Sequence, residues 1–383
     1  MRLHRMTCVA LVAVTLLGST GVVAQADIGT RLQQDADRLL GYGAPGVLVR
    51  LDTPDRAYRV RGGVGDRVAG TPVPWGARFR IGSLTKTFVA TAVLQLVGEG
   101  RLSLDDAVAN LLPGVVTGGH DGGRVTLRQL LQHTSGIADY TRRLDDLETR
   151  EGFQRHRFRH LVPRDLVGLA MTLPPDFAPG TDWGYSNTNY VLAGMILEEV
   201  TGRRWREEVH ARVLAPLGLR NTSTPGAVPV LPPPHARGYH RFAAGEPEVD
   251  VTVMNPSWAD AAGEIVSTAE DVNRFLRALV RGELLAPAQL AEMRTTVPAR
   301  RFEAVWPGVR YGLGLLWIPN SCGGSWAHGG DIHGFRTRNG VSPDGSRSVV
   351  VSLNTDNPAR PGPGVPPPTG DVSAALVDHA LCG

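Results

Sequence analysis

The sequence predicts an α/β (α+β) fold, in which strands from both ends of the chain form one antiparallel sheet flanked by helices. Three observations favour this fold. Alternating apolar residues predict strands near both ends, apolar residues at helical spacing fill the middle, and glycine-rich turns separate the late strands. We expect residues of about 27–95 and 265–383 to form an α/β subdomain, and residues of about 96–264 to form a helical subdomain.

The individual elements follow in chain order. Two alternating segments around Thr53-Pro54-Asp55 predict a hairpin over 46–52 and 57–65. From Ser83 the apolar residues adopt helical spacing, and Gly98 ends this first helix. Further helices are expected within 125–136, 164–173 and 189–202, and a short one near 371–381. The late strands are expected at 311–318, 334–342 and 348–355.

Composition excludes several classes of protein. The chain has 383 residues, of which 42% are hydrophobic and 20% charged, as in ordinary globular proteins. Forty basic and 37 acidic residues give a net charge of +3, which is too even for binding a nucleic-acid backbone. We therefore expect no nucleic-acid partner.

Residues 1–26 are typical of a secretory signal peptide. Arg2 and Arg5 precede an apolar run over 8–17, and Ala24-Gln25-Ala26 resembles a cleavage site. The apolar run is shorter than the roughly 20 residues that a membrane-spanning helix needs. We therefore expect residues 27–383 to be secreted as an extracellular protein without a membrane anchor.

Two cysteines would remain after cleavage, Cys322 and Cys382. An even number of cysteines in an oxidising compartment predicts a disulfide between them. Neither cysteine belongs to a closely spaced pair, and the eleven histidines are scattered along the chain. We therefore expect no metal and no other cofactor.

Ser83 and Lys86 form the first candidate catalytic pair. They lie three residues apart at the start of a predicted helix, and therefore on one face. The helix N-terminus favours an attacking hydroxyl, and a nearby amine of lowered pKa can take its proton. Lys86 is the only lysine among 40 basic residues, and arginine could not serve because it stays protonated. The alternative is an N-cap serine beside a solvent-facing lysine.

Two later segments carry further candidates. Tyr185 and Asn187 lie two residues apart in an expected loop, so a phenol and an amide can face one pocket. His328-Gly329-Gly330-Asp331 lies among the late strands, where glycines allow a substrate to approach a strand edge. Each segment taken alone is also typical of an ordinary turn.

Together the three segments resemble the serine penicillin-binding protein and β-lactamase superfamily. Its S-x-x-K, Y-x-N and K/H-x-G motifs are matched, in order and spacing, by Ser83–Lys86, Tyr185–Asn187 and His328–Gly330. The chain is most similar to the class C-like group, and within it to secreted serine D-alanyl-D-alanine carboxypeptidases. The similar segments are 79–88, 130–136, 185–202, 255–272 and 311–323.

The resemblance implies a β-lactamase/transpeptidase-like fold and a role for each candidate residue. Ser83 would be the acyl nucleophile, and Lys86 and Tyr185 would share proton transfer, with the acylation base left open between them. Asn187 would orient the substrate amide, and Trp258 would line the pocket. The strand of His328, Gly329 and Gly330 would bind substrate, and the backbone N–H groups of Ser83 and Asp331 would form an oxyanion hole.

The sequence departs from the carboxypeptidases where they hold the terminal carboxylate of the substrate. Leu315, Gly329 and Asp331 stand in place of an arginine and two hydroxyl residues. An aspartate there would repel a carboxylate by about 1–4 kcal/mol. His-Gly-Gly with a nearby acid resembles instead the D-stereospecific aminopeptidases, amidases and esterases, although Arg336 or Arg338 could replace the missing arginine.

Three functions remain open. The first is a D-alanyl-D-alanine carboxypeptidase or β-lactamase-like serine hydrolase, and the second is a D-stereospecific aminopeptidase, amidase or esterase. The third is a secreted, non-catalytic binding module. The expected partner is a small molecule or peptide, such as a D-amino-acid peptide, an ester or a β-lactam, and we expect a monomer.

Overall fold

The computed structural model describes residues 20–357 and 370–383. Of the expected signal peptide, residues 1–19 lie outside the described residues. Helix α1, Thr20–Gly41, contains the rest of that segment and was not predicted from the sequence. No described helix is both long enough and apolar enough to cross a membrane.

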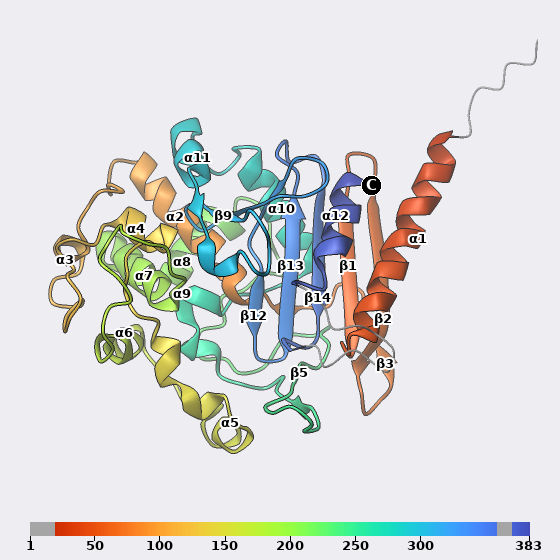
Figure 1. Cartoon of the computed structure of the whole chain (residues 1–383), viewed down its shortest axis with the longest axis horizontal. Helices are drawn as coiled ribbons and strands as arrows, with labels where there is room; N and C mark the ends of the chain where they lie inside the picture. The colour runs from red at the N-terminus through yellow and green to blue at the C-terminus, as the bar shows by residue number, and fades with distance from the viewer. Residues whose placement is uncertain (1–19, 358–369) are drawn as a thin grey trace, which may run out of the picture.

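Both ends of the chain contribute to one antiparallel sheet (Figure 1). Its order is β3-β2-β1-β14-β13-β11-β10-β9-β8, with β12 paired to β13. Strand β1 lies between β2 and the late strand β14, with Val47 opposite Leu353. The strands are β1 Gly46–Asp52, β2 Ala57–Asp66, β3 Thr71–Pro72, β8 Val297–Pro298, β9 Arg310–Tyr311, β10 Leu316–Ile318, β11 Ser325–Ala327, β12 Gly330–Ile332, β13 Phe335–Val341 and β14 Ser348–Leu353.

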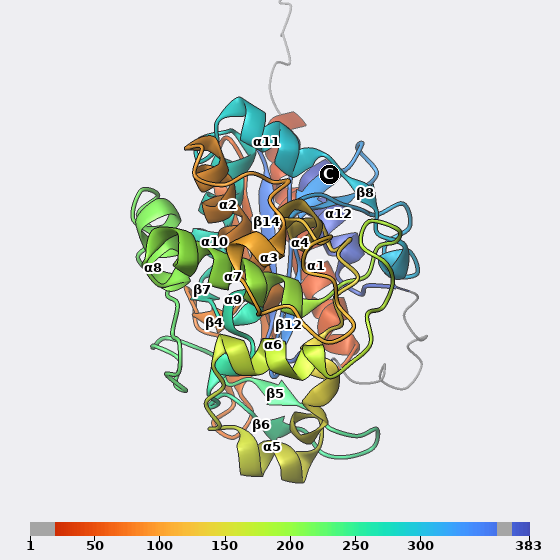
Figure 2. The same cartoon turned by 90° about the vertical axis from the view of Figure 1, so that its left-hand side faces the viewer.

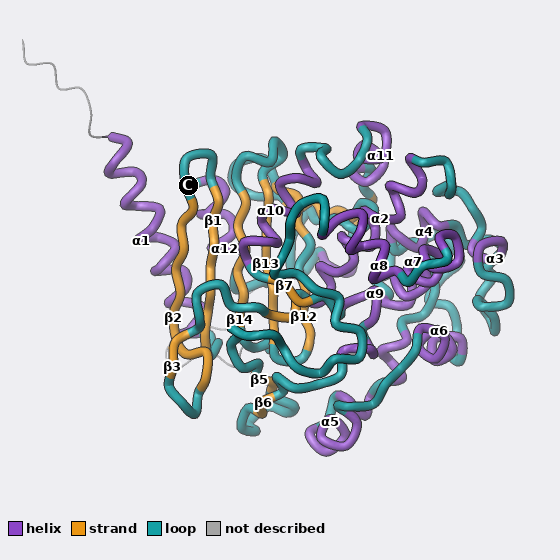
Figure 3. Tube along the Cα trace, turned by 180° about the vertical axis from the view of Figure 1, so that it is seen from behind, coloured by secondary structure: helices purple, strands orange, loops and turns teal. Residues whose placement is uncertain are grey.

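Helices cover both faces of this sheet (Figure 3). On one face lie α1 and α12, Ala374–Cys382, and on the other lies α10, Ala269–Val280. Strand β14 shows why both faces are covered: Val349 and Val351 belong to the apolar cluster under α1 and α12, whereas Val350 belongs to the large core on the other side. Period-two alternation directs neighbouring side chains to opposite faces, and here both faces are apolar.

The remaining helices gather beside the sheet (Figure 2). They are α2 Thr85–Gly98, α3 Val108–Leu111, α4 Leu127–Gln132, α5 Arg150–His156, α6 Pro163–Met171, α7 Asn187–Thr201, α8 Trp205–Val209, α9 Asp260–Gly263 and α11 Pro287–Arg294. Two short strand pairs complete the fold: β4 Phe79–Arg80 with β7 Val266–Ser267, and β5 Tyr239–His240 with β6 Val249–Asp250. Helices α2 and α7 lie side by side, and their buried residues form the centre of the large core.

Two local features differ from or extend the sequence-based expectations. The strand expected at 311–318 is divided into β9 and β10, because a turn closed by the Gly312 N–H to Leu315 carbonyl bond lies between them. Cys322 and Cys382 form a disulfide with an S–S distance of 2.02 Å. This bond ties the loop after β10 to the end of α12.

Candidate active site

Ser83 lies in a single 3-10 turn, Gly82–Leu84, between β4 and helix α2. Gly82 has a φ of 55°, in the left-handed region that favours glycine. A side chain there would also meet the backbone nitrogen of Asp331 at 2.9 Å. The turn therefore places Ser83 at the start of α2 and directly against strand β12.

Lys86 lies one helical turn after Ser83 and is fully buried. Its Nζ donates to Ser83 Oγ at 3.0 Å, to Asn187 Oδ1 at 2.8 Å and to the Ala262 carbonyl at 2.7 Å. Burial lowers the pKa of Lys86 from 10.5 to about 7, against the opposing charge of Asp139. The Asn187 amide oxygen and the Ala262 carbonyl can only accept, so each binds one N–H group of Lys86. When the amine is neutral, its lone pair is then directed toward Ser83.

Tyr185 faces the same serine from the loop before α7. The Lys86 Nζ lies 4.8 Å from the centre of its ring, and its hydroxyl hydrogen-bonds with Ser83. Burial raises the pKa of Tyr185 well above 10. The phenol is therefore protonated at neutral pH and can donate to an atom bound near Ser83 Oγ.

His133 positions the loop that carries Tyr185. It ends α4 with a φ of 62°, and its carbonyl accepts the Gly184 N–H at 2.9 Å. Its Nδ1 accepts from the Ser186 N–H and the Asn189 amide at 3.2 and 3.1 Å, which places the ring proton on Nε2. The His133 and Tyr185 rings are tilted, with centres 4.3 Å apart.

The Asn187 side chain has both its polar atoms occupied. Its Oδ1 accepts from Lys86, and its Nδ2 donates to Asp139 Oδ2 at 3.0 Å. The amide expected to orient substrate is therefore oriented itself, by a carboxylate on one side and an ammonium on the other.

A buried clamp holds the Ala262 carbonyl in place. Arg206 bridges Asp260 and Glu264, at the start of α9 and just after its end, at 2.7 and 2.6 Å. Asp260 has a φ of 39°, which is unusual for a non-glycine residue, and its Oδ1 accepts from the Trp205 indole at 3.1 Å. The four-residue turn that offers its carbonyl to Lys86 is therefore fastened at both ends.

His328 is a neutral, fixed group in the third segment. Its Nδ1 lies 2.7 Å from the Gly329 carbonyl, which can only accept, so Nδ1 carries the proton and Nε2 accepts from the Tyr311 hydroxyl at 2.9 Å. Burial lowers the pKa of His328 to about 3. Asn339 bonds both the N–H and the carbonyl of His328, at 3.1 and 2.7 Å.

Strand β12 packs directly onto the serine turn. A side chain at Gly330 would lie 1.9 Å from the Ile81 carbonyl oxygen and 2.8 Å from the Ser83 nitrogen, so only glycine fits. A two-residue turn joins β12 to β13, so the residues that flank it, Ile332 and Phe335, form a hydrogen-bonded pair. Hydrogen-bonded and non-hydrogen-bonded pairs alternate along antiparallel strands, so the N–H of the preceding residue, Asp331, points away from β13. The backbone nitrogens of Ser83 and Asp331 thus belong to two segments in direct contact, where an oxyanion hole formed by their N–H groups is expected.

Ser83 opens into a cavity of about 510 Å³. Tyr185, Phe302, Trp306 and Leu316 form its apolar wall. The polar wall consists of His328, Gly329, Gly330, Asp331, Arg336, Arg338 and Asp371. The cavity therefore contains the serine, the phenol and the strand edge that the three motifs predict.

The charges in this cavity are paired. Asp331 is about half exposed and contacts Arg336 at 2.7 Å and Arg338 at 3.0 Å. Arg338 also pairs with Asp371. These arginines lower the pKa of Asp331, so it stays ionised. The sequence predicted that an aspartate at this position would repel a carboxylate. The structure adds that Asp331 is paired with arginines, so that two acids and two arginines form one neutral set.

Two expected residues lie elsewhere. Leu315 is fully buried in the turn between β9 and β10 and does not line the cavity. Trp258 packs against His333, with ring centres 5.6 Å apart, and is not among the residues that line the cavity around Ser83. Its place in the substrate pocket stays a prediction.

Sequence reasoning missed Asp139, His133 and Asp371. His133 lies in 130–136, which carried part of the resemblance, but no spacing rule links it to Tyr185. Asp139 is 53 residues from Lys86 and is linked to it through the Asn187 amide, which donates to Asp139 and accepts from Lys86. Asp371 reaches Arg338 only through the packing of α12 on the sheet.

No group of three or more His, Cys, Asp or Glu side chains within residues 20–357 and 370–383 is placed to hold a metal ion. The cavity around Ser83 brings together the serine, the phenol and strand β12, with the Lys86 amine hydrogen-bonded to the serine. Such a set can form and hydrolyse an acyl-serine.

Known proteins share this architecture. The Beta-lactamase family model matches residues 31–369. A D-stereospecific amidohydrolase from Streptomyces sp. is 40% identical, with a TM-score of 0.84 over 93% of this chain and 99% of that one. The D-amino acid amidase of Ochrobactrum anthropi SV3 is 28% identical, with a TM-score of 0.75 over 92% and 95% of the two chains.

Penicillin-binding protein 4 of Amycolatopsis lactamdurans is 34% identical over 62% of this chain. The match spans 59% of that relative's own length. The serine, amine and phenol arranged around one cavity agree with the family match over most of the chain, and this protein therefore belongs to the Beta-lactamase family of serine hydrolases.

Proposed function

We propose that this protein hydrolyses amides of D-amino acids, including short peptides that begin with a D-residue, and does not remove a C-terminal residue that bears a free carboxylate. The observation that carries this proposal is the pairing of Arg336 and Arg338 with Asp331 and Asp371. No hydroxyl is available at Gly329, and both arginines lining the described cavity are paired with acids. A substrate carboxylate would have to compete with Asp331 and Asp371 for these arginines.

The chemistry proceeds through an acyl-serine. Ser83 Oγ attacks the amide carbon while Lys86 Nζ, as the neutral amine, takes the hydroxyl proton. The N–H groups of Ser83 and Asp331 stabilise the oxyanion. The C–N bond then breaks, the amine leaves with a proton from Tyr185, and the proton on Lys86 restores the phenol. Water hydrolyses the ester in a second, equivalent step that returns the proton to Ser83 and releases the acid.

The preference for the D-configuration is supported by the relatives. The Streptomyces protein is described as D-stereospecific, and the Ochrobactrum protein as a D-amino acid amidase. The former matches over 99% of its own length and 93% of this chain. We also propose export from the cytoplasm, because the Cys322–Cys382 disulfide suits an oxidising compartment.

The test compares D-phenylalanine amide with L-phenylalanine amide on purified protein. We expect kcat/KM for the D-amide to exceed that for the L-amide by at least about a hundredfold, a discrimination that enzyme pockets commonly reach. Ser83→Ala provides the blank, and its circular dichroism confirms folding. Equal turnover of the two amides, or turnover that survives in Ser83→Ala, would refute the proposal.

A carboxypeptidase remains the second candidate function, because Arg336 and Arg338 do line the cavity. In that function one arginine would exchange Asp331 for the substrate carboxylate. The relation to penicillin-binding protein 4 favours this reading.

A further inference from the structure

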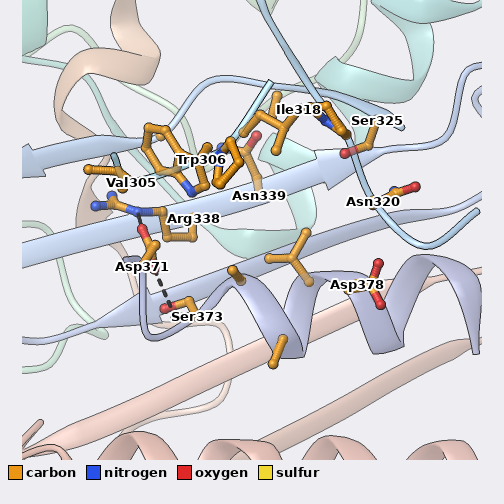
Figure 4. A pocket seen from close by; sticks show the side chains of 17 residues that line it. Val305, Trp306, Ile318, Asn320, Ser325, Arg338, Asn339, Asp371, Ser373 and Asp378 are labelled. Carbon is orange, nitrogen blue, oxygen red and sulfur yellow. Dashed lines mark hydrogen bonds and ion pairs between the residues drawn. The ribbon is translucent and has the colours of Figure 1, made fainter. Parts of the chain in front are cut away.

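A second cavity adjoins the one that contains Ser83 (Figure 4). Its volume is about 350 Å³, within the range of small-molecule sites. It lies between the sheet and the start of α12. Val305, Trp306, Gly329, Arg338 and Asp371 line both cavities, so the two share one wall.

The lining of this second cavity is mainly apolar. Ile318, Ala327 and Val377 contribute to it, together with the shared Trp306. Ser373 and Asn320 also line it, and their buried Oγ and Nδ2 atoms have no hydrogen-bond partner within the described residues. A mostly apolar ligand would suit this lining.

The charges around the second cavity disfavour anions. Arg338 pairs with Asp371 and Asp331, as described above, and contributes no free positive charge. Asp378 lines the far end, where it accepts from the backbone and the hydroxyl of Ser321 at 2.7 and 2.8 Å. A carboxylate entering the cavity would therefore meet an acid, Asp378, for which residues 20–357 and 370–383 show no ion pair with an arginine.

Aromatic rings lead from the reacting atoms to this cavity. The Tyr185 and Phe302 ring centres are 5.4 Å apart, and those of Phe302 and Trp306 are 5.7 Å apart. In the proposed reaction Tyr185 gives its proton to the departing amine, so the amine lies on the Tyr185 side of Ser83. That side continues along these rings to the shared wall at Trp306.

We propose that the second cavity is a leaving-group subsite that binds an apolar side chain, aliphatic or aromatic, of the amine that is released. The preferred substrates are then N-substituted amides and peptides whose second residue is apolar, in place of primary amides. This inference rests on the proposed amide hydrolysis and specifies its substrate class.

The test uses two substrates with the same acyl group, D-phenylalanine amide and D-phenylalanine benzylamide. They give the same acyl-enzyme, so their kcat/KM ratio reports the leaving-group side alone. We expect the benzylamide to be favoured at least tenfold, the scale typical of filling an apolar pocket. Ala374→Phe, an exposed position at the start of α12 that lines the second cavity, should abolish this preference and leave turnover of the primary amide within about twofold.

The matched control is Ala288→Phe, an exposed position near the start of α11 that lines neither cavity. It should retain the preference. Equal kcat/KM for the two amides, or a preference that survives in Ala374→Phe, would overturn the subsite and leave amide hydrolysis standing.

Absence of turnover with either substrate would refute the proposed function and, with it, the assignment to the leaving group. NMR measurement of benzylamine binding to Ser83→Ala protein then distinguishes failure of the proposed hydrolysis alone from failure of the second cavity as a binding site. Binding that Ala374→Phe removes would keep the cavity as an apolar-ligand site, and absence of binding would dismiss it.

Discussion

Two neighbouring regions of the site differ in how their charged groups are held: one is buried and hydrogen-bonded, and the other is partly exposed and ion-paired. The catalytic corner consists of Ser83, Lys86, Tyr185 and Asn187, and its lysine is fully buried with every N–H held. The rim consists of Asp331, Arg336, Arg338 and Asp371, and its Asp331 side chain is 47% exposed. Burial shifts the pKa values of Lys86 and Tyr185 in the corner, whereas the rim consists of paired charges, which we propose control which substrate ends are accepted. The difference suggests that chemistry and specificity can be altered separately.

The largest effect is expected from replacing Lys86. Lys86→Met should lower kcat/KM for a D-amino acid amide by about 10²–10⁴-fold, because the serine loses its proton acceptor. Lys86→Arg should be equally impaired, since a guanidinium does not deprotonate. Steady-state kinetics of the two variants, with circular dichroism as the folding control, checks this. Recovery of activity by arginine would mean that only the positive charge matters.

The pH dependence should follow the same lysine. Its pKa of about 7 means that the neutral, proton-accepting form predominates only above pH 7. We therefore expect kcat/KM to rise about tenfold per pH unit below pH 7 and to level off above it. His328, with a pKa of about 3, stays neutral throughout, and Tyr185 stays protonated. A profile that falls above pH 7 would require a charged lysine and make Tyr185 the base.

The catalytic corner could be predicted from the sequence. For the rim, the sequence indicated Asp331, Arg336 and Arg338, but neither their pairing nor Asp371. Ser83 and Lys86 are joined by one helical turn, and Tyr185 and Asn187 by two residues, so local spacing carries their geometry. The rim depends on register: Asp331 meets Arg336 because they are opposite each other across β12 and β13. Asp371 reaches Arg338 through the packing of a helix that begins three residues later. The same limit explains why the sequence predicted that Asp331 would repel a carboxylate without predicting its ion pairs.

Asp331→Asn should change the rim and leave the corner intact. Removing this acid frees Arg336, while Arg338 keeps Asp371 as its partner, so kcat/KM for a peptide ending in a free carboxylate should rise about tenfold relative to its amidated form. Asp55→Asn, in the turn between β1 and β2, is the matched control and should leave the ratio unchanged. An unaltered ratio in Asp331→Asn would show that the ion pairs do not control specificity.

The smallest effect on catalysis is expected from the disulfide. Cys322→Ser with Cys382→Ser opens a link across 60 residues, which on the loop-entropy model removes roughly 4 kcal/mol from the free energy of unfolding. The link ties α12 on the rim side and does not touch the corner. We therefore expect a lower melting temperature by calorimetry, with kcat for a primary amide changed by less than about threefold. A large loss of kcat would mean that the position of α12 affects the geometry of the catalytic corner.

The central claim is that the rim selects neutral substrate ends and the corner hydrolyses them. The most direct test is the kcat/KM of wild-type protein on a peptide ending in D-Ala-D-Ala and on the same peptide with its terminal carboxylate amidated, with Ser83→Ala as the blank. We predict preference for the amidated peptide. Preference for the free acid would show that an arginine leaves Asp331 to bind the carboxylate, and that the protein is a carboxypeptidase.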